Sequence, residues 1–262
     1  MTDDQLVTTR VEGRTLIITI DRPEVRNAVD RRVAAALADA FALAEGDPEI
    51  WTVVLTGAGD RAFSAGADLK AVFRGEEVHD PRRPELGFAG IVRFDISKPF
   101  IAAVGGLALG GGFEMVLHCD LAVAASSAVF GFPEARVGKM AAAGGAFRIG
   151  RQLPPKLAAE LLYTAEPITA ERALELGLIN RVVADGEALS AALELAERIN
   201  RNSPLSVRAS KRTLLGIDPG RDRDEEDWRR IADADEELLR SADAEEGVRA
   251  FVEKREPLWT GK

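Results

Sequence analysis

Two glycine clusters within one apolar stretch, residues 98–134, constrain the fold of this chain more than any other feature. Gly105 and Gly106 end the apolar run of residues 100–104, and residues 110–112 are all glycine and lead into Phe113 and Glu114. This order predicts a buried strand, a tight backbone crossing and the start of a helix. The first helical turn leaves backbone N–H groups unpaired and partly positive. Glycines there let a ligand oxygen reach the bare backbone, so the stretch predicts an oxygen-binding or anion-binding turn.

Two glutamates accompany this turn. Glu114 lies three residues after Gly111, about one helical turn, so its carboxylate can face the same side as that amide. Glu134 follows in the sequence Phe-Gly-Phe-Pro-Glu, an apolar context that does not suit a solvated surface charge. A single glutamate beside a glycine turn is more often structural than catalytic. Two carboxylates near exposed amide donors, however, indicate acid–base chemistry on a carbonyl compound.

Composition and charge argue against several classes of protein. The chain of 262 residues has a formal charge of −9, which disfavours a general nucleic-acid binder. Its single cysteine, Cys119, rules out an intrachain disulfide and fits a reducing compartment. The first residues resemble neither a secretory signal nor an Arg-rich transit peptide. Glycines and Glu114 argue against a membrane span at residues 99–117. We therefore expect a cytoplasmic protein without nucleic-acid or membrane partners.

Local patterns divide the chain into a first part rich in strands and a later part rich in helices. Apolar and β-branched runs predict strands at residues 14–20, 51–56, 100–104, 120–125 and 128–130. Asp30 can cap a helix that extends to about Ala44, and another helix is predicted near residues 88–96. Residues 75–87 are charged and interrupted by proline, which predicts a mobile loop. Helical apolar spacing then recurs at residues 155–164, 169–176, 187–201, 204–215, 224–241 and 244–253, with a short extended piece at 179–183.

Residues 98–134, and much of the chain from about Arg14 to Trp259, resemble the enoyl-CoA hydratase/isomerase (crotonase) superfamily. The resemblance implies an α/β fold, with a crotonase-like spiral of ββα units in residues 1–200 and a helical C-terminal trimerisation region in residues 201–262. It implies a homotrimer or a dimer of trimers. It also implies an enzyme that adds water reversibly across the 2,3 double bond of a 2-enoyl-CoA thioester. Coenzyme A would arrive as part of this acyl-CoA substrate, with no other cofactor and no metal ion.

The resemblance implies a role for each residue of the central motif. Ala67 and Gly111 match the two backbone donors that form the oxyanion hole around the thioester carbonyl. One such donor lowers the barrier by roughly 3–4 kcal/mol in other enzymes. Glu114 and Glu134 match the two catalytic acids that hold one water in the hydratases. Which glutamate acts as base and which as acid stays open, but the presence of both favours hydration, or dehydration in reverse.

Further positions resemble residues that line the substrate path of the family, although their match is less specific. This substrate-binding set comprises Arg26, Ala65, Asp68, Leu69, Lys70, Ala142, Phe251 and Lys254. The chain departs from the family pattern at Ala141 and Ala142, where proline and glycine are common. In the hydratases the backbone N–H at the position of Ala142 helps to bind the water, and a methyl group there restricts the backbone. We therefore expect an altered acyl pocket.

Three other functions stay open from the sequence. The nearest is another reaction of the same family on an acyl-CoA, either double-bond isomerisation or dehydration of a specialised acyl group such as a carnitine-derived one. Phe113 and Phe132 beside the acids, together with the change at Ala141 and Ala142, keep such a branched or polar substrate open. A homologue that binds acyl-CoA without catalysis is the second alternative. A two-carboxylate glycosidase is the third and the least favoured, because aromatic residues make up only 6% of the chain. Two separate histidines and one cysteine predict no metal site.

Overall fold

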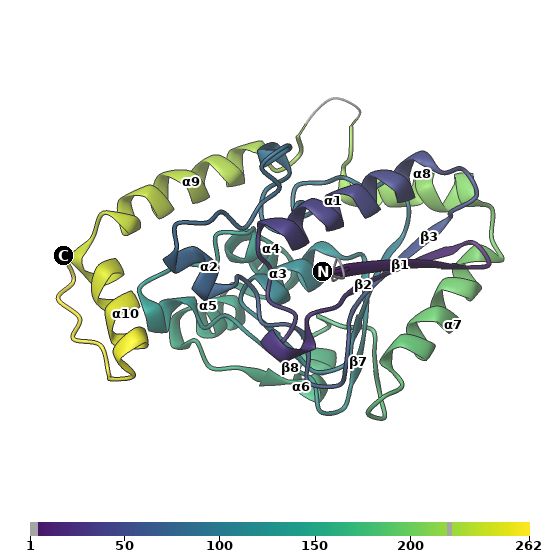
Figure 1. The fold of residues 1–262 in the computed structure, drawn as a ribbon. Helices are drawn as coiled ribbons and strands as arrows, with labels where there is room; N and C mark the ends of the chain where they lie inside the picture. The colour runs from purple at the N-terminus through teal and green to yellow at the C-terminus, as the bar shows by residue number, and fades with distance from the viewer. Residues whose placement is uncertain (1–4, 219–221) are drawn as a thin grey trace.

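The computed structural model describes residues 5–218 and 222–262, and its largest element is a six-stranded sheet (Figure 1). The strand order is β1-β2-β3-β5-β7-β10, in which β1 and β2 are antiparallel and all later neighbours are parallel. These strands are β1 (Val7–Glu12), β2 (Thr15–Ile20), β3 (Thr52–Gly57), β5 (Phe100–Val104), β7 (Leu121–Ala125) and β10 (Arg181–Val183). Parallel neighbours cannot be joined by tight hairpins, so the chain must leave the sheet between them.

A second, four-stranded sheet has the order β4-β6-β8-β9. Its first three strands alternate along the chain with strands of the first sheet. Its members are β4 (Ala62–Ser64), β6 (Leu107–Leu109), β8 (Val129–Gly131) and β9 (Ile168–Thr169). The strands β3, β5 and β7 are each followed by one strand of this second sheet, and β4 and β6 lead into the helices α2 (Leu69–Phe73) and α3 (Gly111–His118). This repeated strand–strand–helix unit confirms the predicted α/β spiral.

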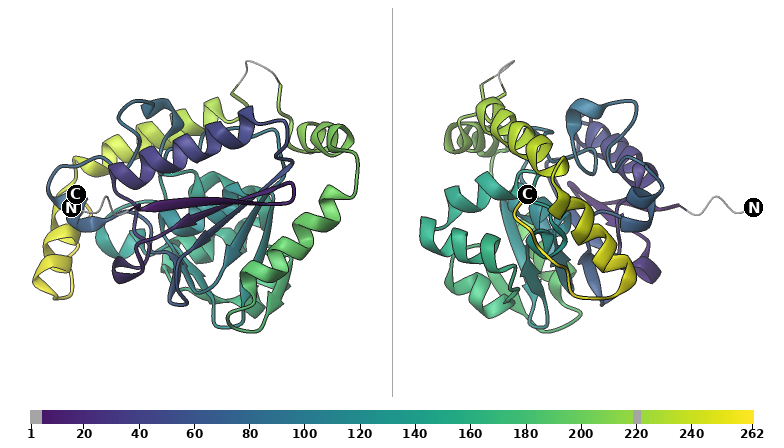
Figure 2. Two further views of the ribbon diagram at one scale, coloured as in Figure 1. Left: turned by 45° about the vertical axis from the view of Figure 1, so that its right-hand side comes forward. Right: turned by 90° about the vertical axis from the view of Figure 1, so that its left-hand side faces the viewer.

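Alternating side chains of the large sheet fill two separate cores. On one face, Val53 and Leu55 of β3 pack in a core with α1 (Arg31–Gly46), and on the other face Val54 packs with α7 (Ala188–Asn200). Figure 2 shows these two helices on opposite sides of the sheet. Because successive strand residues point to opposite faces, a sheet covered on both sides requires the continuous apolar runs found in the sequence.

Most of the predicted helices are confirmed, with small changes at their ends. The expected cap of α1 is present, since the Asp30 carboxylate accepts hydrogen bonds from the N–H groups of Arg32 and Val33 at 2.9 Å. The remaining helices are α4 (Gly145–Gln152), α5 (Pro155–Thr164), α6 (Ala170–Glu175), α8 (Pro204–Leu215), α9 (Glu225–Leu239) and α10 (Ala242–Glu253), with 3-10 helices η1 (Pro23–Val25), η2 (Pro84–Leu86) and η3 (Glu134–Val137). The sequence patterns did not predict α4, β1, β4, β6 or β9.

The helix predicted near residues 88–96 is wrong, because this segment forms a series of turns. Ala89 and Gly90 both have left-handed backbones, with φ of 57° and 67°. A side chain on Gly90 would also place its Cβ 2.4 Å from the carbonyl oxygen of Ala34. The left-handed pair prevents a continuous helix, while Ile91 and Val92 still reach the core. Their burial produced the apolar spacing that resembled a helix.

The charged segment of residues 75–87 is anchored at its middle. Asp80 is fully buried, and its carboxylate pairs with Arg82 at 3.1 Å and with Arg83 at 2.8 Å. Both arginines also pair with Asp39 of α1. The predicted mobility of this loop stays a prediction.

Residues 201–262 contact the body of the same chain at several points. Lys211 of α8 forms an ion pair with Asp120 at 2.7 Å. The helix α10 packs against η3 so closely that a Cβ on Gly247 would lie 2.4 Å from the carbonyl group of Val137. The division near residue 200 and the assembly of several copies stay predictions. Within residues 5–218 and 222–262, no helix is long and apolar enough to cross a membrane.

Candidate active site

The glycine cluster at residues 110–112 forms the predicted turn from a strand into a helix. β6 ends at Leu109, Gly110 follows with φ 55° and ψ −127°, and α3 begins at Gly111. This positive φ favours glycine. Gly112 is needed for a different reason, because a Cβ there would lie 2.1 Å from the carbonyl oxygen of Ser64. The first turn of α3 therefore lies directly against the end of β4.

The same close packing brings together two backbone amides from separate loops. A Cβ on Gly66 would lie 2.8 Å from the backbone nitrogen of Gly111, so the loop before Ala67 contacts the start of α3. Val29 forms a parallel bridge with Ala67 by donating to the Gly66 carbonyl and accepting from the Asp68 N–H, both at 2.8 Å. Within the described part of the chain, the N–H groups of Ala67 and Gly111 donate no hydrogen bond. Two unpaired amides from neighbouring loops can bind one carbonyl oxygen.

Glu114 projects from the first turn of α3 into the interior, where it is only 2% exposed. Its Oε1 accepts a hydrogen bond from the Gly145 N–H at 2.8 Å. Burial, followed by the charge of Glu134, raises the pKa of Glu114 to about 8. The amides of Gly145 and Ala143 and the Arg148 guanidinium act in the opposite direction, because each favours the ionised form.

Glu134 begins η3, directly after β8, and faces the glycine turn. A Cβ on Gly110 would lie 3.0 Å from its Oε1. Its Oε2 is buried and has no hydrogen-bond partner among the described residues. Burial raises the pKa of Glu134 to about 7. Glu114 and Glu134 therefore titrate as a pair near neutrality, where two separate surface carboxyls would both be ionised. A pair that holds one proton can both accept and donate a proton.

Aromatic rings account for the low polarity around the pair. The rings of Phe113 and Phe132 lie 4.8 Å apart, and Phe132 also approaches Gly145, where a Cβ would be 2.7 Å from its Cε1. Phe88 covers Gly111, since a Cβ there would be 2.5 Å from its ring. Phe88 was not predicted as a site residue because it lies in the segment interpreted as a helix. The contacts of Gly145 were also missed, because that glycine is distant in sequence from Glu114.

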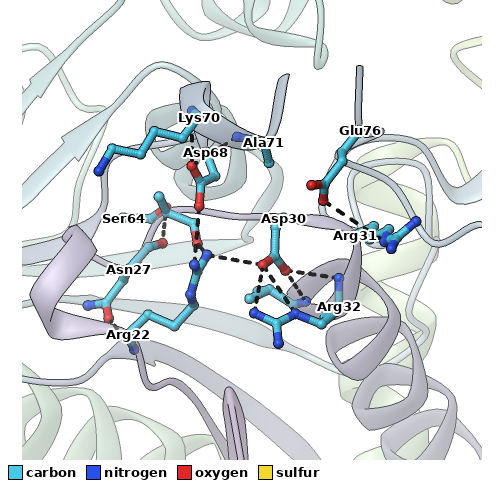
Figure 3. A network of polar contacts seen from close by, with 12 residues as sticks. Arg22, Asn27, Asp30, Arg31, Arg32, Ser64, Asp68, Lys70, Ala71 and Glu76 are labelled. Carbon is cyan, nitrogen blue, oxygen red and sulfur yellow. Dashed lines mark hydrogen bonds and ion pairs between the residues drawn. The ribbon is translucent and has the colours of Figure 1, made fainter. Parts of the chain in front are cut away.

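The predicted substrate path near residues 65–70 is held by a buried ionic network (Figure 3). The Asp68 carboxylate accepts from the N–H groups of Lys70 and Ala71, at 3.1 and 3.3 Å, and pairs with Arg22 at 3.1 Å. Arg22 also donates to the Ala28 carbonyl at 2.7 Å. The side chain of Asp68 therefore builds this loop, and its place along the substrate path stays a prediction.

Other members of the predicted substrate-binding set lie at the surface around this loop. The Ala65 N–H donates to the Arg26 carbonyl at 2.9 Å, which joins the loop after β4 to the turn after η1. Arg26, Leu69 and Lys70 are exposed, and Ala65 is half-buried. Their contact with one ligand stays a prediction.

The remaining predicted positions are separate from the acid pair or already engaged. Phe251 lies on α10 and is 51% exposed, and Lys254 is the exposed left-handed residue that ends this helix. The Ala142 N–H donates to the Met140 carbonyl at 2.8 Å, so the amide that was expected to bind water is used in a tight turn. Within the described ranges, no group of three or more His, Cys, Asp or Glu side chains is arranged to hold a metal ion.

Comparisons with known proteins identify the family of this chain. The profile described as enoyl-CoA hydratase/isomerase matches residues 11–262. Carnitinyl-CoA dehydratases from Salmonella paratyphi A and Salmonella agona are 40% identical over 255 residues, which is 95% of this chain and 96% of each relative. A carnitinyl-CoA hydratase structure from Mycobacterium avium has a TM-score of 0.97 and 53% identity, over 98% of this chain and 99% of that one. An enoyl-CoA hydratase structure from Mycobacterium tuberculosis has a TM-score of 0.77 and 40% identity, over 99% and 100%. This chain therefore belongs to the enoyl-CoA hydratase/isomerase family.

Proposed function

We propose that this enzyme adds water reversibly across the 2,3 bond of an acyl-CoA thioester, and that its acyl group is carnitine-derived. The observation that carries the first part is the pairing of buried Glu114 with partly buried Glu134, beside the unpaired amides of Ala67 and Gly111. This arrangement supplies proton transfer and oxyanion stabilisation, the two requirements of chemistry next to a thioester carbonyl.

In the proposed reaction, the thioester oxygen accepts hydrogen bonds from Ala67 and Gly111. When water attacks C3 of the enoyl group, the C2–C3 double bond becomes an enolate and negative charge develops on this oxygen. Donors already aimed at the oxygen stabilise that charge without reorganising. The CoA moiety enters with the substrate, and the proposal needs no redox cofactor, because addition of water transfers no electrons.

The acid pair completes the addition by moving two protons. One carboxylate of the pair takes a proton from water while the water oxygen bonds to C3, and the other carboxyl gives its proton to C2. The product is a 3-hydroxyacyl-CoA, and the pair as a whole regains its original protonation. Dehydration follows the same steps in reverse: a proton leaves C2, and the C3 hydroxyl departs as water.

The choice of a carnitine-derived acyl group is supported by sequence and structural similarity together. The Mycobacterium avium carnitinyl-CoA hydratase is more similar to this chain in both identity and TM-score than the Mycobacterium tuberculosis enoyl-CoA hydratase. Carnitine contains a quaternary ammonium group, which aromatic rings can bind through cation–π attraction. Phe88 lies against Gly111 and is only partly buried, so it offers such a ring. The second candidate is an enoyl-CoA hydratase for uncharged acyl chains, because the similar structure from Mycobacterium tuberculosis is an enoyl-CoA hydratase.

The deciding experiment compares a cationic substrate with a neutral one of the same shape. Hydration of the CoA ester of 4-trimethylammonio-but-2-enoate would be measured beside that of 5,5-dimethylhex-2-enoyl-CoA, in which carbon replaces the charged nitrogen. We expect a kcat/KM at least about tenfold higher for the cationic ester, which corresponds to ~1.4 kcal/mol of cation–π stabilisation. Equal values, or a preference for the neutral ester, would favour the general hydratase. Binding of both esters without turnover would indicate a non-catalytic acyl-CoA-binding homologue.

The location and assembly of the protein belong to the same proposal. We infer a homotrimer or a dimer of trimers in the cytoplasm. The family resemblance supports the assembly, together with exposed apolar side chains in residues 201–262, namely Leu205, Leu214, Leu239, Phe251, Val252, Leu258 and Trp259. The single cysteine supports a reducing compartment. Light scattering coupled to size exclusion should give three or six times the chain mass of 28.2 kDa, and a monomer would contradict the assembly.

A further inference from the structure

Arg148 of α4 is a buried cation that contacts three separate segments. Its side chain is 7% exposed. The guanidinium donates to the Val92 carbonyl at 2.7 Å and to the Ala143 carbonyl at 3.3 Å, and it lies 3.5 Å from the Asp224 carboxylate. Burial lowers the pKa of Arg148 to about 10, so the group still carries its charge at neutral pH. Such a costly buried charge persists only where its partners are well placed.

The surroundings of this guanidinium fix the turn of residues 143–145. Arg148 lies over the rings of Phe147 and Trp228, with centroids 5.0 and 5.2 Å from its central carbon. Gly144 has φ 98°, and a Cβ on it would be 2.1 Å from a guanidinium nitrogen. The turn therefore wraps around the arginine with no room for a side chain.

The other side of the same turn faces the acid pair. The Gly145 N–H donates to Glu114 at 2.8 Å, and the Ala143 amide also acts on that carboxylate. Arg148 thus holds the Ala143 carbonyl on one side of the turn, while the Gly145 amide of the turn reaches Glu114 on the other.

We propose that Arg148 is a positioning residue for the acid pair: it fixes the turn of residues 143–145 so that the Gly145 amide faces Glu114, and it places a positive charge beside that carboxylate. The importance of this role for turnover rests on the proposed function, but the effect on Glu114 does not.

The charged groups around Arg148 and Glu114 determine the direction of the expected effects. Asp224, Arg151 and Arg223 surround Arg148 in addition to Glu114, while Glu134 is the charge that opposes ionisation of Glu114. A nearby cation favours an ionised carboxylate, so removal of Arg148 should raise the pKa of Glu114 further. Asp224 would not be left unpaired, because Arg151 lies 2.6 Å from it.

The test uses Arg148→Met, which removes both charge and hydrogen bonds, and Arg148→Lys, which keeps only the charge. Arg151→Met is the matched control, since Arg151 lies on the same helix, has an exposed side chain and pairs with Asp224 and Asp227. The first measurement is a ¹³C NMR titration of the Glu114 carboxyl in the full chain, assigned with Glu114→Gln. It requires no substrate. The second is the pH dependence of kcat and KM with the preferred enoyl-CoA ester.

We expect Arg148→Met to raise the pKa of Glu114 and to lower kcat on the order of 100-fold with little change in KM, as for a misplaced catalytic group. Arg148→Lys should raise the pKa of Glu114 less than Arg148→Met does, because the charge is kept, but it should still lower kcat, because one ammonium cannot hold both carbonyls. Arg151→Met should change neither quantity.

Three outcomes would overturn the proposal: an unchanged Glu114 pKa in folded Arg148→Met, an equal shift in Arg151→Met, or full activity in Arg148→Lys. If Arg148→Met does not fold, the lysine variant decides alone. If the original enzyme hydrates no enoyl-CoA ester, the proposed function fails, while the NMR titration still tests the effect of Arg148 on Glu114.

Discussion

Gly145 and Gly150 lie in the same helix, α4, yet differ completely in the space around them. A Cβ on Gly145 would lie 2.7 Å from Phe132 and 2.8 Å from Oε1 of Glu114, whereas a Cβ on Gly150 would meet nothing within 4 Å. We predict that Gly145→Ala displaces the Glu114 carboxylate and lowers kcat on the order of 100-fold. Gly150→Ala should keep full activity and raise stability by roughly 0.5–1 kcal/mol. Steady-state kinetics and thermal melts of both variants check this, and equal activities would contradict it.

The acid pair predicts an unusual pH dependence for a reaction run by two carboxyls. The pKa values of Glu134 and Glu114 are raised to about 7 and about 8, chiefly by burial. Below this range the pair holds two protons and lacks a base, and above it the pair holds none and lacks an acid. We therefore expect kcat/KM to be bell-shaped with its maximum between about pH 7 and 8. A profile from pH 5 to 10 tests this, and a maximum near pH 5 would contradict it.

Substitution of either glutamate of the pair should remove most of the activity. Glu114→Gln and Glu134→Gln each preserve shape but remove one proton-transferring group. We predict a loss of kcat of about 100-fold to 10,000-fold in each variant, the usual contribution of one acid or base. Both variants should still bind the 3-hydroxyacyl-CoA product, which calorimetry measures. Full activity in both variants would exclude the proposed mechanism.

At the scale of elements, the contact between α10 and η3 connects the C-terminal region to the site. A Cβ on Gly247 would lie 2.4 Å from the Val137 carbonyl group, and η3 begins with Glu134. We predict that Gly247→Ala pushes α10 away, destabilises the protein by about 1–3 kcal/mol and lowers kcat. Gly46→Ala, at the end of α1 where a Cβ meets nothing within 4 Å, is the control. Equal melting temperatures and rates in the two variants would contradict the contact.

The elements that the sequence predicts correctly are those specified by local pattern. The turn into α3 follows from three consecutive glycines, and the cap of α1 from Asp30, because both depend on residues within one helical turn. β1 was missed because most of its side chains are exposed and it lacks an apolar alternation. The helix predicted at residues 88–96 was wrong because an apolar pattern does not indicate that Ala89 has a left-handed backbone.

The candidate site divides in the same way between local and distant contacts. Glu114, Glu134 and Gly111 were named from the local pattern and Ala67 from a resemblance, and their roles are still a proposal. The hydrogen bond from Gly145 to Glu114 joins residues 31 positions apart, and the pair of Arg22 with Asp68 spans 46. No spacing rule predicts such contacts, because they depend on how separate turns of the spiral pack. Gly145 and Arg148 could be recognised only in three dimensions.

At the scale of the whole molecule, the acid pair links folding to pH. Each carboxyl has an ordinary pKa of 4.5 when unfolded and a raised pKa when folded, so the folded state holds more protons between these values. Stability must therefore fall as pH rises from about 4.5 through the folded pKa values. His118 acts in the opposite direction, because burial lowers its pKa well below 6.5, so its contribution to stability grows as pH rises through that value. The net curve alone thus cannot isolate the pair.

A comparison of variants separates these contributions. The doubly substituted Glu114→Gln, Glu134→Gln protein keeps His118 but no longer titrates at the pair, so the difference in unfolding free energy from the original protein isolates the two glutamates. Between pH 5.5 and 8.5 we expect this difference to shift steadily in favour of the variant. Buried Asp80, whose pKa is lowered to about 2, stays ionised across this window and does not interfere. Denaturant melts at five pH values measure the difference directly. A difference independent of pH would mean that the two carboxyls are ordinary in the folded state, and that the pair could not hold the proton on which the proposed hydration depends.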